Sequence, residues 1–324
     1  MPSYSGVWTL TAQFQAVGQG LWPPNYVAPT AVFGGGYNAS AVNTIDYISI
    51  ETTGNATDFG DLTLARYNIG ACSSSTRGVF GGGNDSSNRS NVLDYVTIAT
   101  TGNAIDFGDI LAPTDSVPSG CGSSTRGIFG GGFISGGYTN VIQYITIASV
   151  GNAIDFGDLI DPTGYSGACS STTRGVWAGG DRPSGSGGVS AVIAYVTIAS
   201  TGNATNFGNL PASRSGLAGC SNSTRGLFGG GGPLSNSSNI IEYITIATTG
   251  NATDFGDLTV NLFGVAGAAS STRATFAGGY NASFVRQNVI DYVTIATTGN
   301  ATDFGDLTLA RDGPAGCSNS HGGL

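Results

Sequence analysis

The sequence predicts an all-β protein, a six-bladed β-propeller of four-stranded antiparallel blades, closed by a C-terminal strand that joins the first blade. Three observations predict this fold class. A unit of about 48 residues recurs along the chain. A complete copy contains four short strand-like stretches. The first copy lacks the first of these stretches, and an additional one follows the last copy.

Three aromatic series mark the repeat and keep the same order in every copy. The first precedes a run of small residues and comprises Phe33, Phe80, Phe129, Trp177, Phe228 and Phe276. The second comprises Tyr47, Tyr95, Tyr144, Tyr195, Tyr243 and Tyr292, and the third Phe59, Phe107, Phe156, Phe207, Phe255 and Phe304. The interval from each Tyr to its Phe is the same in every copy. Six copies of such a unit are typical of propeller blades.

The second copy shows how one unit divides into strands. Strand A is a small-residue stretch that ends near Cys72, and strand B covers residues 77–80 before a run of glycines. Strand C covers residues 92–98, where β-branched and aromatic residues alternate as in a half-buried strand. Strand D covers residues 104–107. Residues 101–103, Thr-Gly-Asn, predict a tight hairpin between C and D because Gly and Asn tolerate positive φ.

The two ends of the repeat region predict how the ring closes. No complete strand A precedes Phe33, whereas residues 315–320 read as a strand A with no further unit behind them. We therefore expect residues 315–320 to complete the first blade, which removes the free sheet edges that invite aggregation. The propeller is expected to span residues 28–324, with residues 1–27 as a separate N-terminal segment.

The order of these motifs resembles the kelch family. In kelch repeats a double glycine ends the second strand, and a Tyr and a large aromatic residue follow at set distances. Here a Gly run, Tyr95 and Phe107 take those places in the second copy. The resemblance covers roughly residues 28–324 and implies a propeller, although Phe usually stands where kelch repeats carry Trp.

Composition and charge exclude several classes of function. Only 10% of the residues are charged, the formal net charge is -9, and every basic residue is Arg. Such a surface repels nucleic-acid phosphates and anionic lipid. No apolar run approaches the roughly 18 residues of a membrane-spanning helix. We expect neither a nucleic-acid partner nor a membrane span.

The cysteines and the histidine predict no catalytic site. The cysteines share one repeat position: Cys72, Cys121, Cys169, Cys220 and Cys317, with Ala268 in the remaining copy. Equivalent positions in a sixfold ring lie farther apart than the roughly 4.4–6.8 Å between the Cα atoms of a disulfide. We therefore interpret them as free thiols, with a ring of metal-binding thiolates as the alternative. His321 is the only histidine, so we expect a structural or solvent-exposed role for it, no enzyme activity and no cofactor.

Acidic residues recur beside the third aromatic series. They are Asp58 and Asp61, Asp106 and Asp109, Asp155 and Asp158, Asp254 and Asp257, and Asp303 and Asp306, with Asn206 and Asn209 in the fourth copy. One interpretation is a set of cation sites with oxygen ligands. The other is that they cap turns and pair with the arginines of the Ser-Thr-Arg turns, such as Arg77. An element of nearly every blade favours the scaffold role, so we predict no metal site.

The loops between strands B and C and between strands D and A vary, whereas the other turns are nearly constant. In an up-and-down blade these variable loops share one end of the propeller, and loops on a rigid scaffold commonly carry recognition. We therefore expect the contact surface there, with unconstrained loops as the alternative. The candidate binding residues are Tyr37, Phe133, Tyr138, Arg182, Tyr280, Phe284 and Arg286. Their side chains suit either a glycan or a protein.

The N-terminal segment, residues 1–27, lies outside the repeat and predicts a short amphipathic helix, because Leu10, Phe14, Val17 and Leu21 follow helical spacing. The stretch of residues 5–23 resembles the start of tailed-phage virion proteins, particularly those of marine phages. This resemblance implies an anchor that docks on another virion component; packing on its own propeller is the alternative. The docking residues would be Trp8, Leu10, Phe14, Val17, Leu21 and Trp22.

Together these features predict a non-enzymatic bacteriophage structural protein located in the virion, as a tail fibre, knob or surface decoration. Its expected partners are other virion proteins, further copies of itself in a homo-oligomer or multi-copy assembly, and a glycan or protein of the host surface. The alternative is a non-viral, lectin-like propeller that binds carbohydrate.

Overall fold

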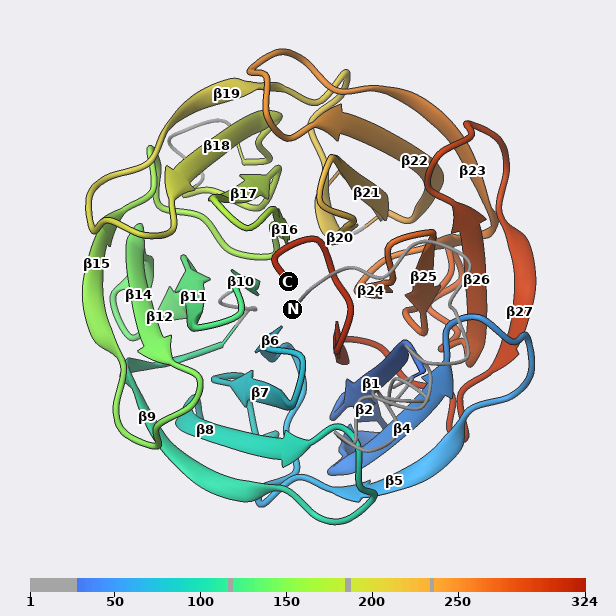
Figure 1. The fold of residues 1–324 in the computed structure, drawn as a ribbon, viewed down its shortest axis with the longest axis horizontal. Coiled ribbons are helices and arrows are strands. Elements are labelled where there is room, and N and C mark those ends of the chain that lie inside the picture. The colour runs from blue at the N-terminus through green and yellow to red at the C-terminus, as the bar shows by residue number, and fades with distance from the viewer. Residues whose placement is uncertain (1–27, 116–118, 184–187, 234–235) are drawn as a thin grey trace, which may run out of the picture.

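Each copy of the repeat folds into one four-stranded antiparallel sheet, and six such sheets stand around a central channel (Figure 1). The structure is a computed structural model and describes residues 28–115, 119–183, 188–233 and 236–324. The six sheets are the blades of a β-propeller, so the predicted fold class is confirmed.

Within each blade the strands run in the order A, B, C and D from the channel to the outside. Blade 1 contains β28 (Ala315–Ser318), β1 (Thr30–Gly34), β4 (Thr44–Ser49) and β5 (Thr57–Asp61), and blade 2 contains β6 (Gly70–Ser73), β7 (Arg77–Gly81), β8 (Ser90–Thr97) and β9 (Ile105–Thr114). Blade 3 contains β10 (Ser119–Gly122), β11 (Arg126–Gly130), β14 (Val141–Thr146) and β15 (Ile154–Asp158), and blade 4 contains β16 (Gly167–Ser170), β17 (Arg174–Ala178), β18 (Val192–Thr197) and β19 (Thr205–Asn209). Blade 5 contains β20 (Ser215–Ser221), β21 (Arg225–Gly232), β22 (Ser238–Thr245) and β23 (Thr253–Leu262), and blade 6 contains β24 (Ala266–Ala269), β25 (Arg273–Ala277), β26 (Val289–Thr294) and β27 (Thr302–Asp306).

The ring closes as predicted, because β28 is the inner strand of blade 1. It pairs antiparallel with β1 in a register that sets Val32 opposite Cys317. Beyond the strand, Asn319 continues the contact, and its Oδ1 accepts a hydrogen bond from Thr30 N at 2.8 Å. The two ends of the repeat region are therefore held in one sheet.

The hydrophobic core lies between neighbouring blades. One cluster of buried residues combines Val32 and Phe59 of blade 1 with Phe80 and Val96 of blade 2. Burying a side chain of this size stabilises the fold by about 1.5–3 kcal/mol relative to exposing it. The first and third aromatic series thus mark the repeat because they fill the same space in every interface.

The cysteines pack in these interfaces and are free, as predicted. A Cβ added to Gly78 would lie 2.9 Å from the Sγ atom of Cys317 in the preceding blade, and one added to Gly175 would lie 3.0 Å from Cys121 Sγ. Each of these thiols therefore occupies the space that a glycine on the next blade leaves open. Burial raises the pKa of Cys121 and Cys317 to about 12. Because the thiols point into different interfaces, they do not converge on a metal ion.

The hairpin predicted at residues 101–103 is wrong, since the turn between strands C and D lies before it. Thr100 N donates to Thr97 O at 3.0 Å and forms that turn. Residues 102–104 instead run along the outer strand of the preceding blade. There Gly102 N donates to Phe59 O at 2.8 Å, and Asn103 Oδ1 accepts from Asp61 N at 3.1 Å. Thr-Gly-Asn is therefore a contact between blades.

This contact recurs around the ring and explains why every copy of the repeat carries a glycine after the Asp-Phe or Asn-Phe of strand D. Between blades 6 and 1 it consists of Gly54 N donating to Phe304 O at 2.8 Å. A Cβ on Gly60 would lie 2.5 Å from the carbonyl of Gly102, so the glycine of Asp-Phe-Gly-Asp lets the next blade approach. The repeated motifs at both positions follow from how the blades dock.

The predicted pairing of the Ser-Thr-Arg arginines with the repeated acids is also wrong. Arg77 lies 4.6 Å over the ring of Tyr95 in its own blade, and its NH1 donates to Ile147 O of the next blade at 3.0 Å. A cation–π contact of this kind contributes about 0.5–1 kcal/mol at an exposed site. The serine of the turn does act as a cap, since Ser74 Oγ accepts from Arg77 N at 3.1 Å.

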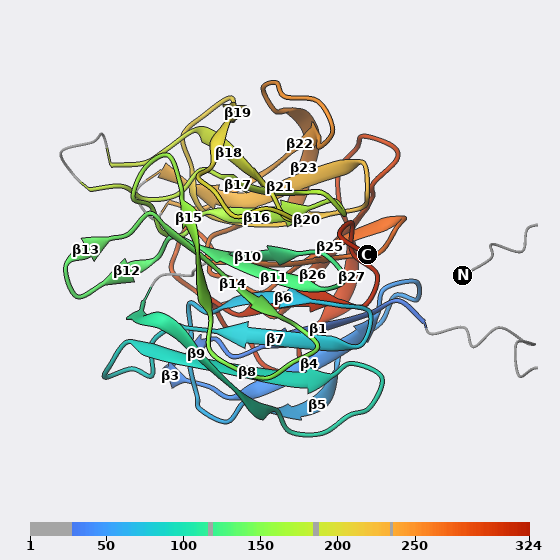
Figure 2. The same ribbon diagram turned by 60° about the vertical axis from the view of Figure 1, so that its left-hand side comes forward.

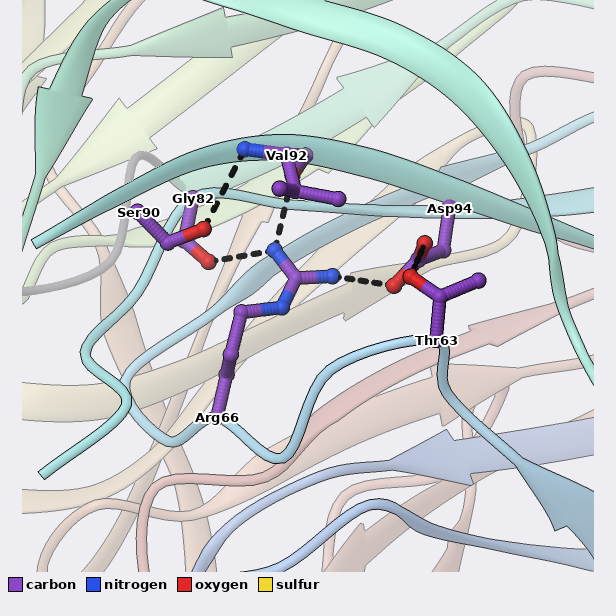
Figure 3. A network of polar contacts seen from close by, with 6 residues as sticks. All are labelled: Thr63, Arg66, Gly82, Ser90, Val92 and Asp94. Atoms are coloured by element: carbon purple, nitrogen blue, oxygen red, sulfur yellow. Dashed lines mark hydrogen bonds and ion pairs between the residues drawn. The ribbon is translucent and has the colours of Figure 1, made fainter.

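Buried ion pairs occur instead where the repeat varies. In blade 2 the guanidinium of Arg66, which follows strand D of blade 1, pairs with Asp94 (Figure 3), and both side chains are fully buried. The same two repeat positions hold Arg214 with Glu242 and Arg311 with Asp46. In blades 2 and 5 the arginine also bonds carbonyls at the base of the B–C loop, so the pair attaches the D–A loop to the blade that follows it.

Candidate functional site

The two ends of the propeller differ in how they are built. We define the upper face as the end that carries the B–C and D–A loops, and the lower face as the end that carries the A–B and C–D turns. Seen from the side, the hairpin of β12 (Phe133–Ile134) and β13 (Gly137–Tyr138) projects at the upper face, and the C-terminal residues lie at the other end (Figure 2). The sequence repeats on the lower face and varies on the upper face.

Residues 319–324 cross the lower mouth of the channel (Figure 1). The Nε2 atom of His321 donates to Ser73 O in blade 2 at 2.9 Å, and Gly322 N donates to Ser221 O in blade 5 at 2.8 Å. Gly323 N donates to Nδ1 of the same imidazole at 3.0 Å. The bond from Nε2 to Ser73 O and the bond from Gly323 N to Nδ1 fix the neutral tautomer of His321 that carries its proton on Nε2. As predicted from the sequence, His321 has a structural role.

Acidification is expected to weaken the hold of His321 on the lower mouth. Burial lowers the pKa of His321, which the Ser73 carbonyl only partly offsets. A folded-state pKa below the unfolded value means that the imidazole contributes stability above about pH 6.5, and that this stability is lost as pH falls through the folded pKa. The resonances of the single histidine in an NMR titration should give a pKa below about 6.5 in the native protein and near that value in urea. Equal values in both states would contradict the contact.

In the part of the chain that the structure describes, the upper mouth is lined by residues in the left-handed conformation near the start of the inner strand of blades 1, 2, 4, 5 and 6. Gly216, Gly264 and Gly313 occupy this position in blades 5, 6 and 1, with φ between 63° and 69°. Asn68 and Tyr165 occupy it in blades 2 and 4, with φ of 54° and 56°. In blades 1, 2, 5 and 6 the backbone N–H of this residue donates to the equivalent residue of a neighbouring blade, as in Asn68 N to Gly313 O at 2.8 Å. The mouth is thus bounded by circumferential hydrogen bonds.

Tyr165 stands out in this ring, because a bulky residue with positive φ is an uncommon and costly choice. Its hydroxyl accepts a hydrogen bond from Asn68 Nδ2 at 3.0 Å, although the two residues belong to blades 4 and 2. Its ring lies 6.3 Å from that of Phe263 of the D–A loop between blades 5 and 6. Tyr165 therefore brings a polar and aromatic side chain to the mouth where blades 1, 5 and 6 carry Gly.

Two of the predicted binding residues, Tyr37 and Arg286, meet at the junction of blades 6 and 1. The guanidinium of Arg286 lies 4.5 Å over the Tyr37 ring, and its Nε donates to Asp312 Oδ1 at 2.6 Å. Tyr67 packs edge-on against Tyr37 with the ring centroids 5.0 Å apart. Burial raises the pKa of Asp312 and the neighbouring arginine opposes that shift.

Two further predicted residues, Tyr280 and Phe284, form a stack beside this junction. The Tyr280 ring lies 5.1 Å from Phe263 at an interplanar angle of 27°, and 5.5 Å from Phe284 at 29°. Phe263 is buried, whereas Phe284 is 68% exposed. The three rings form a ladder from the core to the solvent.

The remaining predicted residues lie around blades 3 and 4 and form separate contacts. Phe133 and Tyr138 face each other across the β12–β13 hairpin with their centroids 5.0 Å apart, and Arg89 lies 4.9 Å over the Phe133 ring. Burial and the nearby charge of Asp181 raise the pKa of Tyr138 to about 12. Arg182 pairs with Asp161 at 3.2 Å. The structure therefore distributes the seven predicted residues over four groups on one face: Tyr37 with Arg286, Tyr280 with Phe284, Phe133 with Tyr138, and Arg182 with its partner Asp161.

The sequence prediction missed the partners of these residues, because the partners come from the D–A loops. They are Tyr67, Asp115, Asp161, Phe263 and Asp312. Asn68 and Tyr165 of the same loops bond to each other. Antiparallel bridges join the two kinds of loop, such as Tyr37 with Asp312 and Phe263 with Tyr280. One signal was available at a single position, since Tyr165 replaces a residue that is Gly in three other copies.

Nothing in the described residues suggests a metal centre or a bilayer-spanning helix. No group of three or more His, Cys, Asp or Glu side chains within residues 28–115, 119–183, 188–233 and 236–324 could hold a metal ion. In the same ranges no helix is long and apolar enough to cross a membrane. The predicted docking residues Trp8, Leu10, Phe14, Val17, Leu21 and Trp22 lie outside the described residues.

Exposed apolar side chains gather on the outer strands of blades 2 and 3. Ile105 and Ile154 are 59% and 57% exposed at a strand-D position that holds Thr in the other four blades, and Val150 is 59% exposed where the other copies also carry Thr. The C–D loop of blade 3 brings Val150 beside β9, since Gly151 N donates to Phe107 O at 2.7 Å. The outer surface of the ring thus departs from the repeat at these two blades.

No protein-family description matches the sequence, and no curated protein is significantly similar to it.

Proposed function

We propose that this chain is a binding protein, not an enzyme, which recognises its target through the upper face of the propeller. One observation carries this proposal: the aromatic, arginine and acidic side chains that break the repeat collect on the upper face and are held there by contacts between loops. Tyr37, Arg286 and Asp312 are the clearest case. Side chains that are ordered before binding lose little entropy on contact, which favours recognition.

We further propose that the propeller is mounted on a bacteriophage particle through residues 1–27. The resemblance of residues 5–23 to the start of tailed-phage virion proteins supports this part of the proposal. A multi-copy particle would present many upper faces at once, and multivalent contact raises avidity by about 10²–10⁴ without any new interaction. A modest affinity of each upper face would then suffice for attachment to a host.

Antibody fragments against defined surfaces test both parts. A fragment whose epitope includes the upper face is expected to label particles of the encoding phage and to block their adsorption to host cells. A fragment against the outer strands around Ile105 should label the particles equally without blocking adsorption. Labelling absent from particles would contradict the virion role. Adsorption blocked equally by both fragments, or by neither, would contradict recognition through the upper face.

A free lectin-like propeller is the second candidate, favoured by the exposed aromatic ladder that ends at Phe284. It shares the upper-face site and differs in what residues 1–27 contact. Cross-linking within purified particles separates the two: cross-links from this segment to another virion chain support the phage role. Cross-links confined to the segment's own propeller favour the free lectin.

A further inference from the structure

The loop of blade 6 that carries Phe284 is an extended version of the loop of blade 1. Both loops begin with Tyr-Asn-Ala-Ser, at Tyr37 and Tyr280. The stretch from Tyr280 to the Tyr of strand C is longer by two positions than the corresponding stretch from Tyr37. The common motif is followed by Ala41 in blade 1 and by Phe284 in blade 6, and Arg286 comes shortly after Phe284. Blade 6 has thus acquired an aromatic ring and a guanidinium.

The additional aromatic ring is held rigidly. The Oδ1 atom of Asn281 accepts hydrogen bonds from Ser283 N at 3.0 Å and Val285 N at 3.1 Å, and Asn281 N donates to Val285 O at 3.0 Å. Phe284 lies inside this turn with φ of 57°, and its ring stacks on Tyr280. Such strain at a bulky residue is often found at ligand-binding positions. One face of the ring is therefore packed, and 68% of the residue remains exposed.

The polar groups beside this ring are also fixed. The backbone of Arg286 forms an antiparallel bridge with Tyr280, the residue on which Phe284 stacks. The backbone position from which the guanidinium extends is therefore fixed. Its Nε holds Asp312, and about a third of the Arg286 side chain is exposed. The terminal guanidinium nitrogens supply further N–H donors, and the Asp312 carboxylate has acceptor capacity beyond one bond. The guanidinium thus comes from the same loop as the exposed ring of Phe284, and Asp312 is bound to that guanidinium.

We propose that this part of the upper face is a subsite for a neutral saccharide, with one pyranose ring stacked on Phe284 and its hydroxyl groups bound by Arg286 and Asp312. The proposal rests on the binding role proposed above and adds the chemical class of the ligand. The C–H face of a pyranose is apolar and carries partial positive charge, which suits the negative face of an aromatic ring. Its hydroxyl groups need both donors and acceptors.

The size of the exposed apolar area favours a sugar over a protein. In the described B–C loops of the upper face, the large apolar residues with more than half of their surface exposed are Phe284 and Val285. The exposed apolar residues that follow Asp-Phe-Gly-Asp, namely Leu111, Ile160 and Val260, belong to other copies of the repeat. A standard protein interface buries about 800 Å² on each partner around an apolar core. One ring and one Val side chain match a single sugar unit. They do not provide the core of a protein interface.

The charge of the surroundings favours a neutral sugar over an acidic one. The described loops of the upper face set Asp85, Asp115, Asp161, Asp181 and Asp312 against Arg89, Arg182 and Arg286, and the chain has a formal net charge of -9. Sialylated, sulfated and uronic-acid glycans would meet this negative field. Neutral hexoses and N-acetylhexosamines would not.

The test measures binding of the full chain to immobilised neutral and acidic polysaccharides: mannan, galactan, β-glucan and chitin oligosaccharides against alginate, heparin and polysialic acid. We expect retention on at least one neutral polymer and none on the acidic ones. Phe284→Ala should weaken binding at least tenfold while leaving the melting temperature within error, because Ala is the residue that blade 1 carries in its corresponding loop. Adding Arg286→Gln to Phe284→Ala should weaken glycan binding beyond the loss that Phe284→Ala causes alone. Ile154→Thr, an exposed apolar residue far from the loop replaced by the residue of other blades, is the matched control and should bind as the unchanged chain does.

Each other outcome overturns the inference. Binding that survives Phe284→Ala, or retention on the acidic polymers alone, would remove the proposed subsite or its class. No retention on any glycan, together with adsorption blocked by the upper-face antibody fragment, would leave the binding role standing and indicate a protein target. No retention and no block would contradict both proposals.

Discussion

Removal of residues 315–324 is expected to abolish the cooperative unfolding transition and to shift the chain from a monodisperse species to aggregates. The deletion takes away β28, the inner strand of blade 1. It also removes Cys317 from the core between blades 1 and 2 and the carbonyl of Ser318 that accepts from Ser73 Oγ at 2.7 Å. The edge of β1 would then be open to pairing with other chains. Circular dichroism melts and size-exclusion chromatography measure both effects.

A shorter deletion provides the control. Removing residues 320–324 takes away the segment under the channel, including His321, and leaves β28 and its pairing with β1 intact. This variant is expected to elute from the size-exclusion column as the unchanged chain does and to melt cooperatively at a somewhat lower temperature. The same melting curve for both deletions would contradict the view that closure depends on the strand.

The fold could be predicted from the sequence because the repeat sets the same residues into the same environment six times. The Tyr and Phe that recur at a constant interval are neighbours on adjacent strands, as in the edge-to-face pair of Tyr95 and Phe107, 5.9 Å apart. The missing inner strand at one end and the surplus strand at the other then allow only one simple closure. Neither inference needs knowledge of how a blade docks on its neighbour.

The docking between blades could not be predicted from local signals. Gly102 and Asn103 have the composition of a turn, but here they form backbone and side-chain bonds to Phe59 and Asp61 of another blade. Turn propensity describes what a short segment prefers alone and carries no information about an approaching strand. The misplacement of the Ser-Thr-Arg arginines has the same cause, since Arg77 is bound by a carbonyl of the next blade.

The sequence predicted individual residues of the candidate site, but it did not predict which of them contact one another. Aromatic residues and arginines in variable loops identified Tyr37, Tyr280, Phe284 and Arg286. Asp312 was not identified, because it lies in another loop and reaches Arg286 only in the closed ring. A residue that differs from the other copies of the repeat is the signal that would have helped most to find Asp312. The residues of the buried ion pairs differ between the copies in the same way.

The replacement Asp94→Ala is expected to destabilise the propeller by about 3–5 kcal/mol, the usual result of stranding one partner of a buried ion pair. Arg66 is fully buried, and its NH1 donates to Gly82 O and Val92 O, each at 2.7 Å, while its NH2 pairs with Asp94 (Figure 3). Burial lowers the pKa of Arg66, and the Asp94 carboxylate opposes this shift. Without the carboxylate the guanidinium would be a buried, uncompensated charge. Urea denaturation monitored by tryptophan fluorescence measures the loss.

Blade 6 supplies a matched control for this replacement. Asp291 occupies the same repeat position but accepts hydrogen bonds from Thr259 N at 2.8 Å and Thr259 Oγ1 at 2.7 Å, and Leu262 stands in place of the arginine. Asp291→Ala removes an acceptor and strands no charge, so we expect a smaller loss of about 1–3 kcal/mol. Equal losses for Asp94→Ala and Asp291→Ala would contradict the role assigned to the buried charge.

The double variant Arg66→Thr, Asp94→Ala is expected to recover much of the stability that Asp94→Ala loses. Blade 4 already carries this combination, with Thr163 and Ala194 at the two positions, and it folds into the same four-stranded sheet. A neutral pair avoids the cost of removing two charges from water, which often makes replacement of a whole buried pair nearly neutral. A double variant no more stable than Asp94→Ala would show that Arg66 stabilises the blade by its bonds to Gly82 and Val92, independently of the carboxylate. The repeat thus contains its own comparison set, because positions that differ between blades show which combinations one scaffold accepts.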